Sequence, residues 1–116
     1  MEEILKKMEE MIGEKPMPQV LFSKICPEWI PRQIEERKFV MDLPEIPEKY
    51  KHLIMIAVSA ALQCEMCTEV FVKIAKRRGV SDREIAEAIL TARFAMASTI
   101  FATATNALKW LVGEDK

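Results

Sequence analysis

A helix stop followed at once by a helix start, at residues 76–84, narrows the possible folds of this chain more than any other feature. Residues 76–78 are basic, which a helix C-terminus favours, and Gly79 can take the left-handed conformation that ends a helix. Ser81 and Glu84 then have the spacing of a capping box, in which each side chain accepts a hydrogen bond from the other residue's backbone N–H. The sequence therefore predicts two helices joined by a turn of very few residues.

Apolar residues recur at spacings of three and four through most of the 116-residue chain, a pattern typical of amphipathic helices. The chain has only three glycines and few alternating β-branched runs, so little of it suits a sheet. We therefore expect an all-α bundle of about six helices. These cover residues 2–11, 20–25, 27–41 (or from Ile30, because of Pro31), 48–63, a stretch from the cysteine pair to 76–79, and 81–111, with or without a break at 96–99.

Pro44 and Pro47 mark a linker between two parts of the chain. We expect one compact domain in which an N-terminal helical segment, residues 1–43, packs on a core formed by residues 44–116. A chain of 116 residues can bury only a modest core by itself. Partner subunits are therefore expected to cover further apolar surface.

The charge balance argues against several classes of partner. The formal net charge is −1, with 30% charged residues, so no basic surface for nucleic acid or anionic lipid is indicated. The longest runs without a charged residue, 53–64 and 94–108, are shorter than the roughly 18 residues needed to span a bilayer. The acidic, amphipathic N-terminus is unlike a signal peptide. We expect a cytoplasmic protein that binds neither nucleic acid nor membrane.

Cys64 and Cys67 are the residues whose spacing points to chemistry. On a helix, positions three apart lie about 60° from each other, so both sulfurs share one face and can form a disulfide. A bridge across two residues restrains the unfolded chain very little, which argues against a purely structural role. At a helix N-terminus one thiol would be stabilised as thiolate, and the other could resolve its oxidised form.

Two other interpretations of the pair remain open. Both cysteines could be small buried hydrophobes, the role we also expect for Cys26. A zinc site needs two more ligands, and besides carboxylates only Cys26 and His52 are available, although a site shared between subunits would relax this requirement. We therefore expect neither a metal nor a cofactor.

His52 is the only histidine and a candidate catalytic base. It precedes Cys64 by 12 residues, which is about 18 Å along a straight helix and on a different face. Contact with the thiols therefore needs a bend or an approach from another subunit. The alternative is an exposed histidine beside Lys49 and Lys51 at a helix start.

The runs 53–67 and 75–88 combine an apolar helix, the CxxC, a glycine-terminated helix and a capped Glu-Ile-Ala-Glu helix. This order and spacing resembles the carboxymuconolactone decarboxylase and AhpD-like superfamily over roughly residues 42–112. The resemblance implies helical subunits that assemble as homotrimers or homohexamers. In its alkylhydroperoxidase branch the second cysteine attacks the peroxide and the first resolves it, which would make Cys67 the peroxidatic thiol and Cys64 the resolving thiol. A dihydrolipoamide- or thioredoxin-like dithiol would supply the electrons.

The chain departs from that branch in its proton relay. His52 stands where the branch has a glutamate, Phe71 where it has a histidine four residues after the second cysteine, and Met66 where a further histidine often lies between the cysteines. Carried over, His52 would act as the base at the glutamate position without the histidine that links that position to the thiol.

The leading interpretation is a thiol-dependent oxidoreductase with antioxidant activity. It would cycle Cys64 and Cys67 between dithiol and disulfide, with a hydroperoxide or a disulfide as substrate. The alternatives are a cofactor-free decarboxylase of the carboxymuconolactone type, or a non-enzymatic redox sensor or assembly module that has lost the relay.

Overall fold

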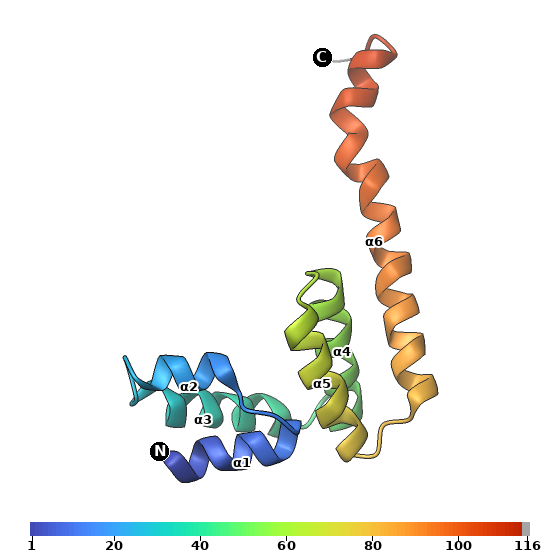
Figure 1. Cartoon of the computed structure of the whole chain (residues 1–116). Helices are drawn as coiled ribbons and strands as arrows, with labels where there is room; N and C mark the ends of the chain where they lie inside the picture. Colours follow the sequence, from blue (N-terminus) through green and yellow to red (C-terminus); the bar gives the residue numbers. More distant parts are fainter. Residues whose placement is uncertain (115–116) are drawn as a thin grey trace.

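All secondary structure in the described part of the chain is helical, which confirms the all-α prediction (Figure 1). The structure is a computed structural model and describes residues 1–114. Six helices follow one another along these residues: α1 (Glu2–Ile12), α2 (Met17–Ser23), α3 (Trp29–Asp42), α4 (Glu48–Ala61), α5 (Glu65–Arg77) and α6 (Asp82–Leu111).

The core lies between α4, α5 and the beginning of α6. Helices α4 and α5 form an antiparallel hairpin, and the first turns of α6 pack beside it (Figure 1). The buried cluster consists of Ile56, Ala75, Val80 and Ile85, with Leu53, Phe71 and Val72 packed against it. Burying such side chains is the main favourable contribution to folding, so this three-helix unit holds the site region in place.

The turn between α5 and α6 is built as predicted. Gly79 has φ = 89°, the left-handed conformation that ends α5. Ser81 Oγ accepts from the Glu84 N–H at 3.1 Å, and Glu84 Oε1 accepts from the Ser81 N–H at 3.0 Å. Both halves of the capping box are therefore present, and α6 begins immediately after α5 ends.

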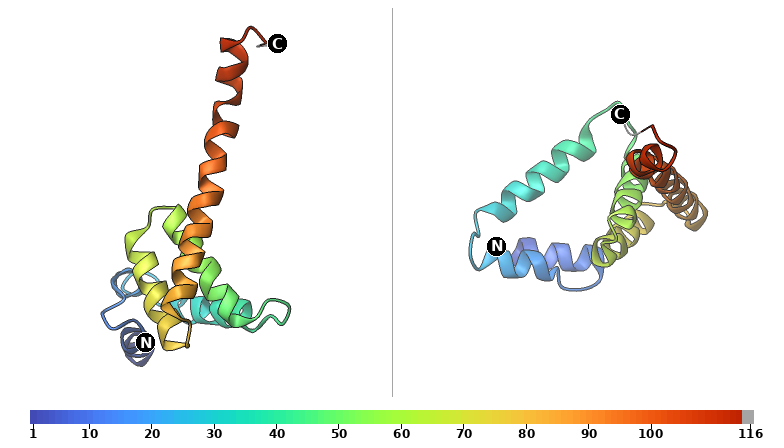
Figure 2. Two further views of the ribbon diagram at one scale, coloured as in Figure 1. Left: turned by 90° about the vertical axis from the view of Figure 1, so that its right-hand side faces the viewer. Right: turned by 90° about the horizontal axis from the view of Figure 1, so that it is seen from above.

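Helices α1 to α3 form an arm beside the base of the hairpin, shown from above in Figure 2. Lys51 of α4 is only 8% exposed, and its ammonium donates to the carbonyls of Val40, Met41 and Leu43 at 2.7, 3.2 and 2.6 Å. These carbonyls are the free acceptors at the end of α3, so one lysine joins α3 to α4 and complements the dipole of α3.

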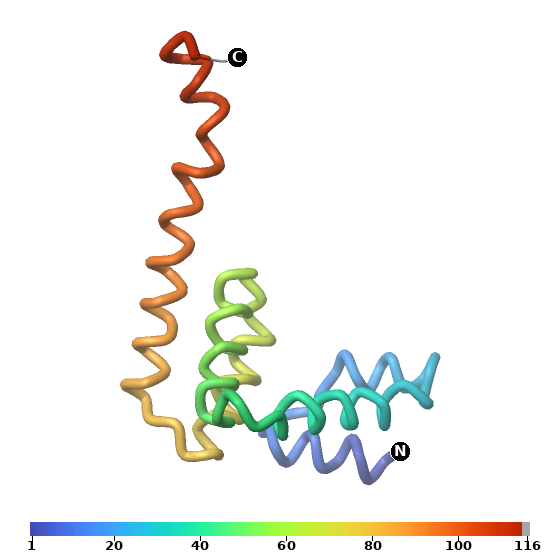
Figure 3. The backbone as a smooth tube through the Cα atoms, turned by 180° about the vertical axis from the view of Figure 1, so that it is seen from behind, coloured from blue at the N-terminus to red at the C-terminus, as the bar shows by residue number. Residues whose placement is uncertain are grey.

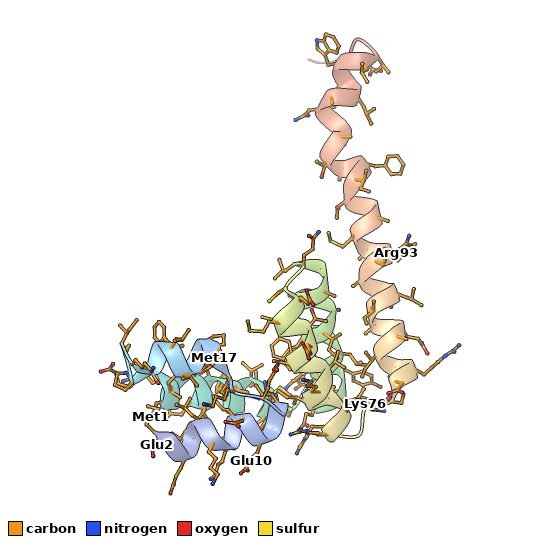
Figure 4. All side chains as sticks on the ribbon, in the orientation of Figure 1. Met1, Glu2, Glu10, Met17, Lys76 and Arg93 are labelled. Carbon is orange, nitrogen blue, oxygen red and sulfur yellow. The ribbon has the colours of Figure 1, made fainter. Side chains whose placement is uncertain are left out.

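Helix α6 is continuous over 30 residues, and no break occurs at 96–99. Its second half extends beyond the hairpin, as Figure 3 shows from behind, and its side chains there project away from the other helices of residues 1–114 (Figure 4). The molecule consequently measures 63 × 36 × 27 Å, with a radius of gyration of 18.8 Å. A compact domain of about 100 residues has a radius of gyration near 13 Å.

The exposed side chains of α6 are mostly apolar. Phe94 is 78% exposed and Phe101 76%, and the same holds over much of the helix: Leu90, Ile100, Trp110 and Leu111 are each more than 60% exposed. In the described chain α6 alone has the length and mean hydropathy, 1.4, of a helix that could cross a membrane. The core helix of a soluble protein passes the same test, so this finding assigns no location.

Several helix boundaries differ by a few residues from the sequence prediction, among them the end of α2 at Ser23 instead of residue 25, and two of the differences have clear local reasons. Helix α2 begins at Met17 instead of residue 20, because Pro18 falls in the first turn, where a missing N–H costs nothing. Helix α4 ends at Ala61 because Gln63 takes φ = 60° and turns the chain out of the helix. Pro31 lies in the first turn of α3 and is accommodated in the same way as Pro18.

Candidate functional site

The junction between α4 and α5 places the two cysteines. Gln63 is the one described residue other than glycine with a positive φ, and Cys64 follows it in an extended conformation, φ = −91° and ψ = 94°. The Cys64 N–H donates to the carbonyl of Ser59 at 3.0 Å, which fixes the turn to the end of α4. Cys64 is thereby the N-cap residue of α5, and Cys67 lies in the first turn of that helix.

The sulfur of Cys64 caps α5 in the way that a serine or aspartate oxygen usually does. It accepts the N–H of Cys67 at 3.3 Å, one of the donors that a helix start leaves without a partner. The two thiols therefore lie on one helical turn, and the Cys67 N–H joins them.

This contact drives the two thiol pKa values in opposite directions. Hydrogen bonds from the Cys67 thiol and then from the Cys67 N–H lower the pKa of Cys64. The hydrogen bond to Cys64, followed by desolvation, raises the pKa of Cys67. Because the thiolate is the reactive form of cysteine, the lowered pKa makes Cys64 the more readily ionised thiol of the pair.

Cys64 lines two depressions in the surface. One of about 490 Å³ is lined by Ala60, Gln63, Cys64, Glu65, Thr68 and Glu69. The other, of about 270 Å³, has both cysteines in its wall and is otherwise largely apolar: Ile54, Met55, Val58, Ser59, Leu62 and Phe71. The Ser59 hydroxyl donates to the Met55 carbonyl, so it offers little polarity to this second depression.

His52 is buried, with 2% of its surface exposed, so the alternative of an exposed histidine is wrong. Its Nε2 lies 3.1 Å from Glu48 Oε2, one helical turn earlier on α4. Glu48 also accepts two hydrogen bonds from the guanidinium of Arg78, at 2.7 and 3.0 Å. Arg78 follows the end of α5, whereas Cys64 precedes its start, so within one chain His52 lies at the opposite end of the hairpin from the thiols.

The group around His52 is an ionic cluster that sequence reasoning did not find. Hydrogen bonds from Arg78, and then from His52, lower the pKa of Glu48 to about 2. The spacing of Glu48 and His52, four residues on one helix, was a usable signal for their contact. The contact with Arg78 joins residues 30 positions apart, and nothing in the local sequence indicates it.

Cys26 lies outside the thiol site. It is half-buried in the turn between α2 and α3. A fully buried core thiol was expected from the sequence, so the burial of Cys26 is smaller than expected. A hydrogen bond with Glu28 is the main cause that raises its pKa, so it is held as the protonated thiol. Among residues 1–114, no three histidine, cysteine or acidic side chains gather in a way that could hold a metal ion.

The fold and site define an all-helical protein with a cysteine pair at the start of a core helix. The family model of the carboxymuconolactone decarboxylase family matches residues 30–110, from the start of α3 almost to the end of α6. The chain therefore belongs to the carboxymuconolactone decarboxylase family, as the sequence resemblance indicated.

A curated relative gives a narrower comparison. The chain is 38% identical over 63 residues to a protein of Paracoccus denitrificans named "Uncharacterized protein 4 in cox locus". The alignment covers 54% of this chain and 57% of the relative, so the chain matches just over half of that protein's length. That name states no activity, so the relative assigns no activity to this chain.

Proposed function

We propose that this protein is a thiol-dependent oxidoreductase that cycles Cys64 and Cys67 between dithiol and disulfide. The observation that carries the proposal is the placement of Cys64 and Cys67 on one helical turn, with the Cys67 N–H donating to the sulfur of Cys64 at 3.3 Å. A pair with one lowered and one raised pKa has the division of labour that thiol redox chemistry needs, a nucleophile and a resolving thiol.

The reaction balances without a metal or an organic cofactor. With a hydroperoxide, two thiols and ROOH give one disulfide, ROH and water. With a disulfide substrate, two exchange steps transfer the bridge to Cys64 and Cys67 and release the substrate as a dithiol. A dihydrolipoamide- or thioredoxin-like dithiol then reduces the bridge by the same exchange, and a cytoplasmic location would supply such a reductant.

The surroundings of the pair support turnover more than a structural role. Cys67 is exposed and Cys64 half-buried, so both sulfurs can be reached from solvent. The apolar depression beside them, with Phe71 and Leu62 in its wall, suits an organic group on the substrate. A disulfide here would close only a very small loop and add little stability.

We also propose that the working form is a homo-oligomer, a trimer or hexamer as the resemblance implies. The support is the unpartnered apolar surface of α6, which far exceeds single scattered apolar residues. A second copy of the chain is the simplest cover for such a helix, since most soluble oligomers are built from identical subunits.

The direct test is to add one equivalent of an organic hydroperoxide to the fully reduced protein. We expect rapid peroxide consumption and a Cys64–Cys67 bridge on peptide mass spectrometry. Cys26→Ser should react like the unmodified protein, because Cys26 lies in the N-terminal arm, whereas Cys64→Ser and Cys67→Ser should form no intramolecular bridge.

Other results would point to the alternatives. A bridge that forms and reopens with dithiol, but without peroxide or disulfide turnover, would indicate a redox sensor. Decarboxylation of a lactone-like carboxylate that survives replacement of both cysteines would indicate the decarboxylase branch.

A further inference from the structure

The proposed homo-oligomer leaves open which surfaces of two copies meet. We propose that α6 pairs with the α6 of a second copy, running in the opposite direction, across a seam formed by Leu90, Phe94, Ala97, Phe101, Ala104 and Leu108. This inference rests on the proposed homo-oligomer and adds its geometry. A pair of this kind has a two-fold axis, so every assembly built from it has an even number of subunits. A hexamer of three pairs fits this rule, whereas a trimer does not.

Helix α6 has two apolar sides that point in opposite directions. Ile85 is buried in the core with residues of α4 and α5, and Ala92, seven residues later, is partly buried on the same side. At 100° per residue, the seam lies about 180° around the helix from that side. Leu90, Phe94 and Phe101 in the seam are 62%, 78% and 76% exposed. The core of the same chain therefore leaves the seam uncovered.

The seam has the spacing of a helix that packs lengthwise against another helix. Its residues follow one another at alternating steps of four and three, the heptad pattern of paired helices. No charged residue occurs from 94 to 108, and α6 contains no glycine or proline at which its second half could fold back on the hairpin. A lipid surface requires no such repeat, so the pattern favours a helix of another copy as the partner.

The order of large and small side chains favours the antiparallel direction. Parallel copies would place identical residues opposite each other, so that two phenylalanines meet at one level and two alanines at the next. With the direction reversed, one register sets Phe94 against the partner's Ala104 and Phe101 against the partner's Ala97. The leucines at the two ends of the seam also meet in this register. Each ring then fills the space beside a methyl group, which keeps the two helices evenly spaced.

Ile100 fits the same arrangement. It is 67% exposed and lies beside the seam, one residue from its centre at Thr99. In the antiparallel register the two-fold axis passes at this centre, so Ile100 lies next to the same residue of the partner. In a parallel pair it would instead lie against the polar side chain of Thr105.

The seam is large enough for a specific interface. An aromatic side chain buries about 150–250 Å², so the exposed parts of Phe94 and Phe101 amount to roughly 230–380 Å² per subunit. Leu90, Ile100 and Leu108 are 62%, 67% and 45% exposed and add to this area. A specific interface buries about 1,000 Å² or more in total, which is about 500 Å² per subunit. The seam with Ile100 therefore reaches the size of a specific interface.

Engineered disulfides test the direction and the register. The full chain with Cys26, Cys64 and Cys67 replaced by serine is the background for Phe94→Cys and Ala104→Cys, produced separately and by co-expression. On mild oxidation we expect a covalent dimer from the co-expressed variants and little from either variant alone, because positions 94 and 104 face each other. Efficient cross-linking of Phe94→Cys with itself would indicate parallel helices and overturn the proposal.

Ala102→Cys is the matched control for Ala104→Cys. Ala102 is on the same helix but lies about 160° around it from Ala104, away from the seam. Co-expression of Phe94→Cys with Ala102→Cys should give no covalent dimer. A yield equal to that with Ala104→Cys would remove the seam as the contact between the two copies.

Native mass spectrometry of the unmodified, reduced protein tests the symmetry. The mass of one chain is 13.3 kDa, and we expect assemblies at even multiples of it, with a dimer as the smallest unit on partial dissociation. An isolated trimer would overturn the antiparallel pair and keep a homo-oligomer. A monomer would overturn both, and flotation of that monomer with phosphatidylcholine vesicles would assign the exposed side of α6 to lipid.

The pair and the proposed thiol chemistry fail separately. No residue of α6 lines the two depressions beside the cysteines. A protein that forms the cross-link between positions 94 and 104, but in its unmodified form consumes neither peroxide nor disulfide, would lose the proposed function and keep the pair. A protein that turns over peroxide as a trimer or monomer would keep the function and lose the pair.

Discussion

Replacing Lys51 by Met tests how the N-terminal arm is held on the hairpin. Methionine keeps a similar buried stem but removes the ammonium, so three carbonyls at the end of α3 lose their donor. A hydrogen bond to a charged group contributes about 1.5–3 kcal/mol. The three bonds share one ammonium, and Val40 and Leu43 are 44% and 47% exposed, so water can reach part of this helix end. Counting the equivalent of one to two such bonds, we expect a loss of about 2–4 kcal/mol in the free energy of unfolding.

The measurement is urea unfolding followed by circular dichroism at one fixed protein concentration, since assembly would otherwise shift the apparent stability. The midpoint should fall at an unchanged slope. Lys38→Met is the matched control, because Lys38 pairs with Asp42 near the same helix end, but their side chains are 77% and 62% exposed. An exposed pair of this kind contributes less than about 1 kcal/mol. A cost for Lys51→Met no larger than that of Lys38→Met would refute the reasoning.

Three further predictions concern the ionic cluster, the turn before the thiols and α6. The folded state lowers the pKa of Glu48 from 4.5 to about 2, so the carboxylate stabilises the fold above pH 4.5, and this contribution is lost as the pH falls towards 2. Arg78→Gln should therefore flatten that part of a curve of stability against pH. An unchanged curve would contradict the role of Arg78. Gln63→Gly should leave stability unchanged or raise it, because glycine takes φ = 60° without strain, whereas Gln63→Val should cost about 1–2 kcal/mol in a thermal melt. Phe101→Glu places a charge on the exposed apolar face of α6 and should lower the oligomer mass measured by light scattering. Lys7→Glu on α1 is the control. Equal masses for the two variants would exclude this face of α6 from the interface between subunits.

Local signals in the sequence were sufficient for the helices and for the pair of thiols. The turn at Gly79 and the capping box at Ser81 depend on residues within one turn of each other, and both formed as expected. The sequence left open whether Cys64 and Cys67 begin a helix or lie just inside a continuing one, and in the structure Cys64 is the N-cap of α5.

Contacts between distant residues were not readable from the sequence. Glu48, the hydrogen-bond partner of His52, also binds Arg78, which follows the end of another helix. The anchoring of α3 by Lys51 likewise joins residues that no periodic pattern connects. The unbroken course of α6 was undecided, because its alanine-rich middle suits a straight helix and offers no break signal strong enough to choose.

The cap that Cys64 provides for α5 has a consequence for how oxidation affects the rest of the molecule. In the reduced state Cys64 is the N-cap of α5 and Cys67 lies in the first turn of the same helix, with the Cys67 N–H bonded to the Cys64 sulfur. A bond between them needs little backbone movement, so α4, α6 and the arm can keep their places through each redox cycle. In the proposed cycle, oxidation would be a local event confined to one helical turn, which suits repeated turnover better than transmission of a signal to distant surfaces.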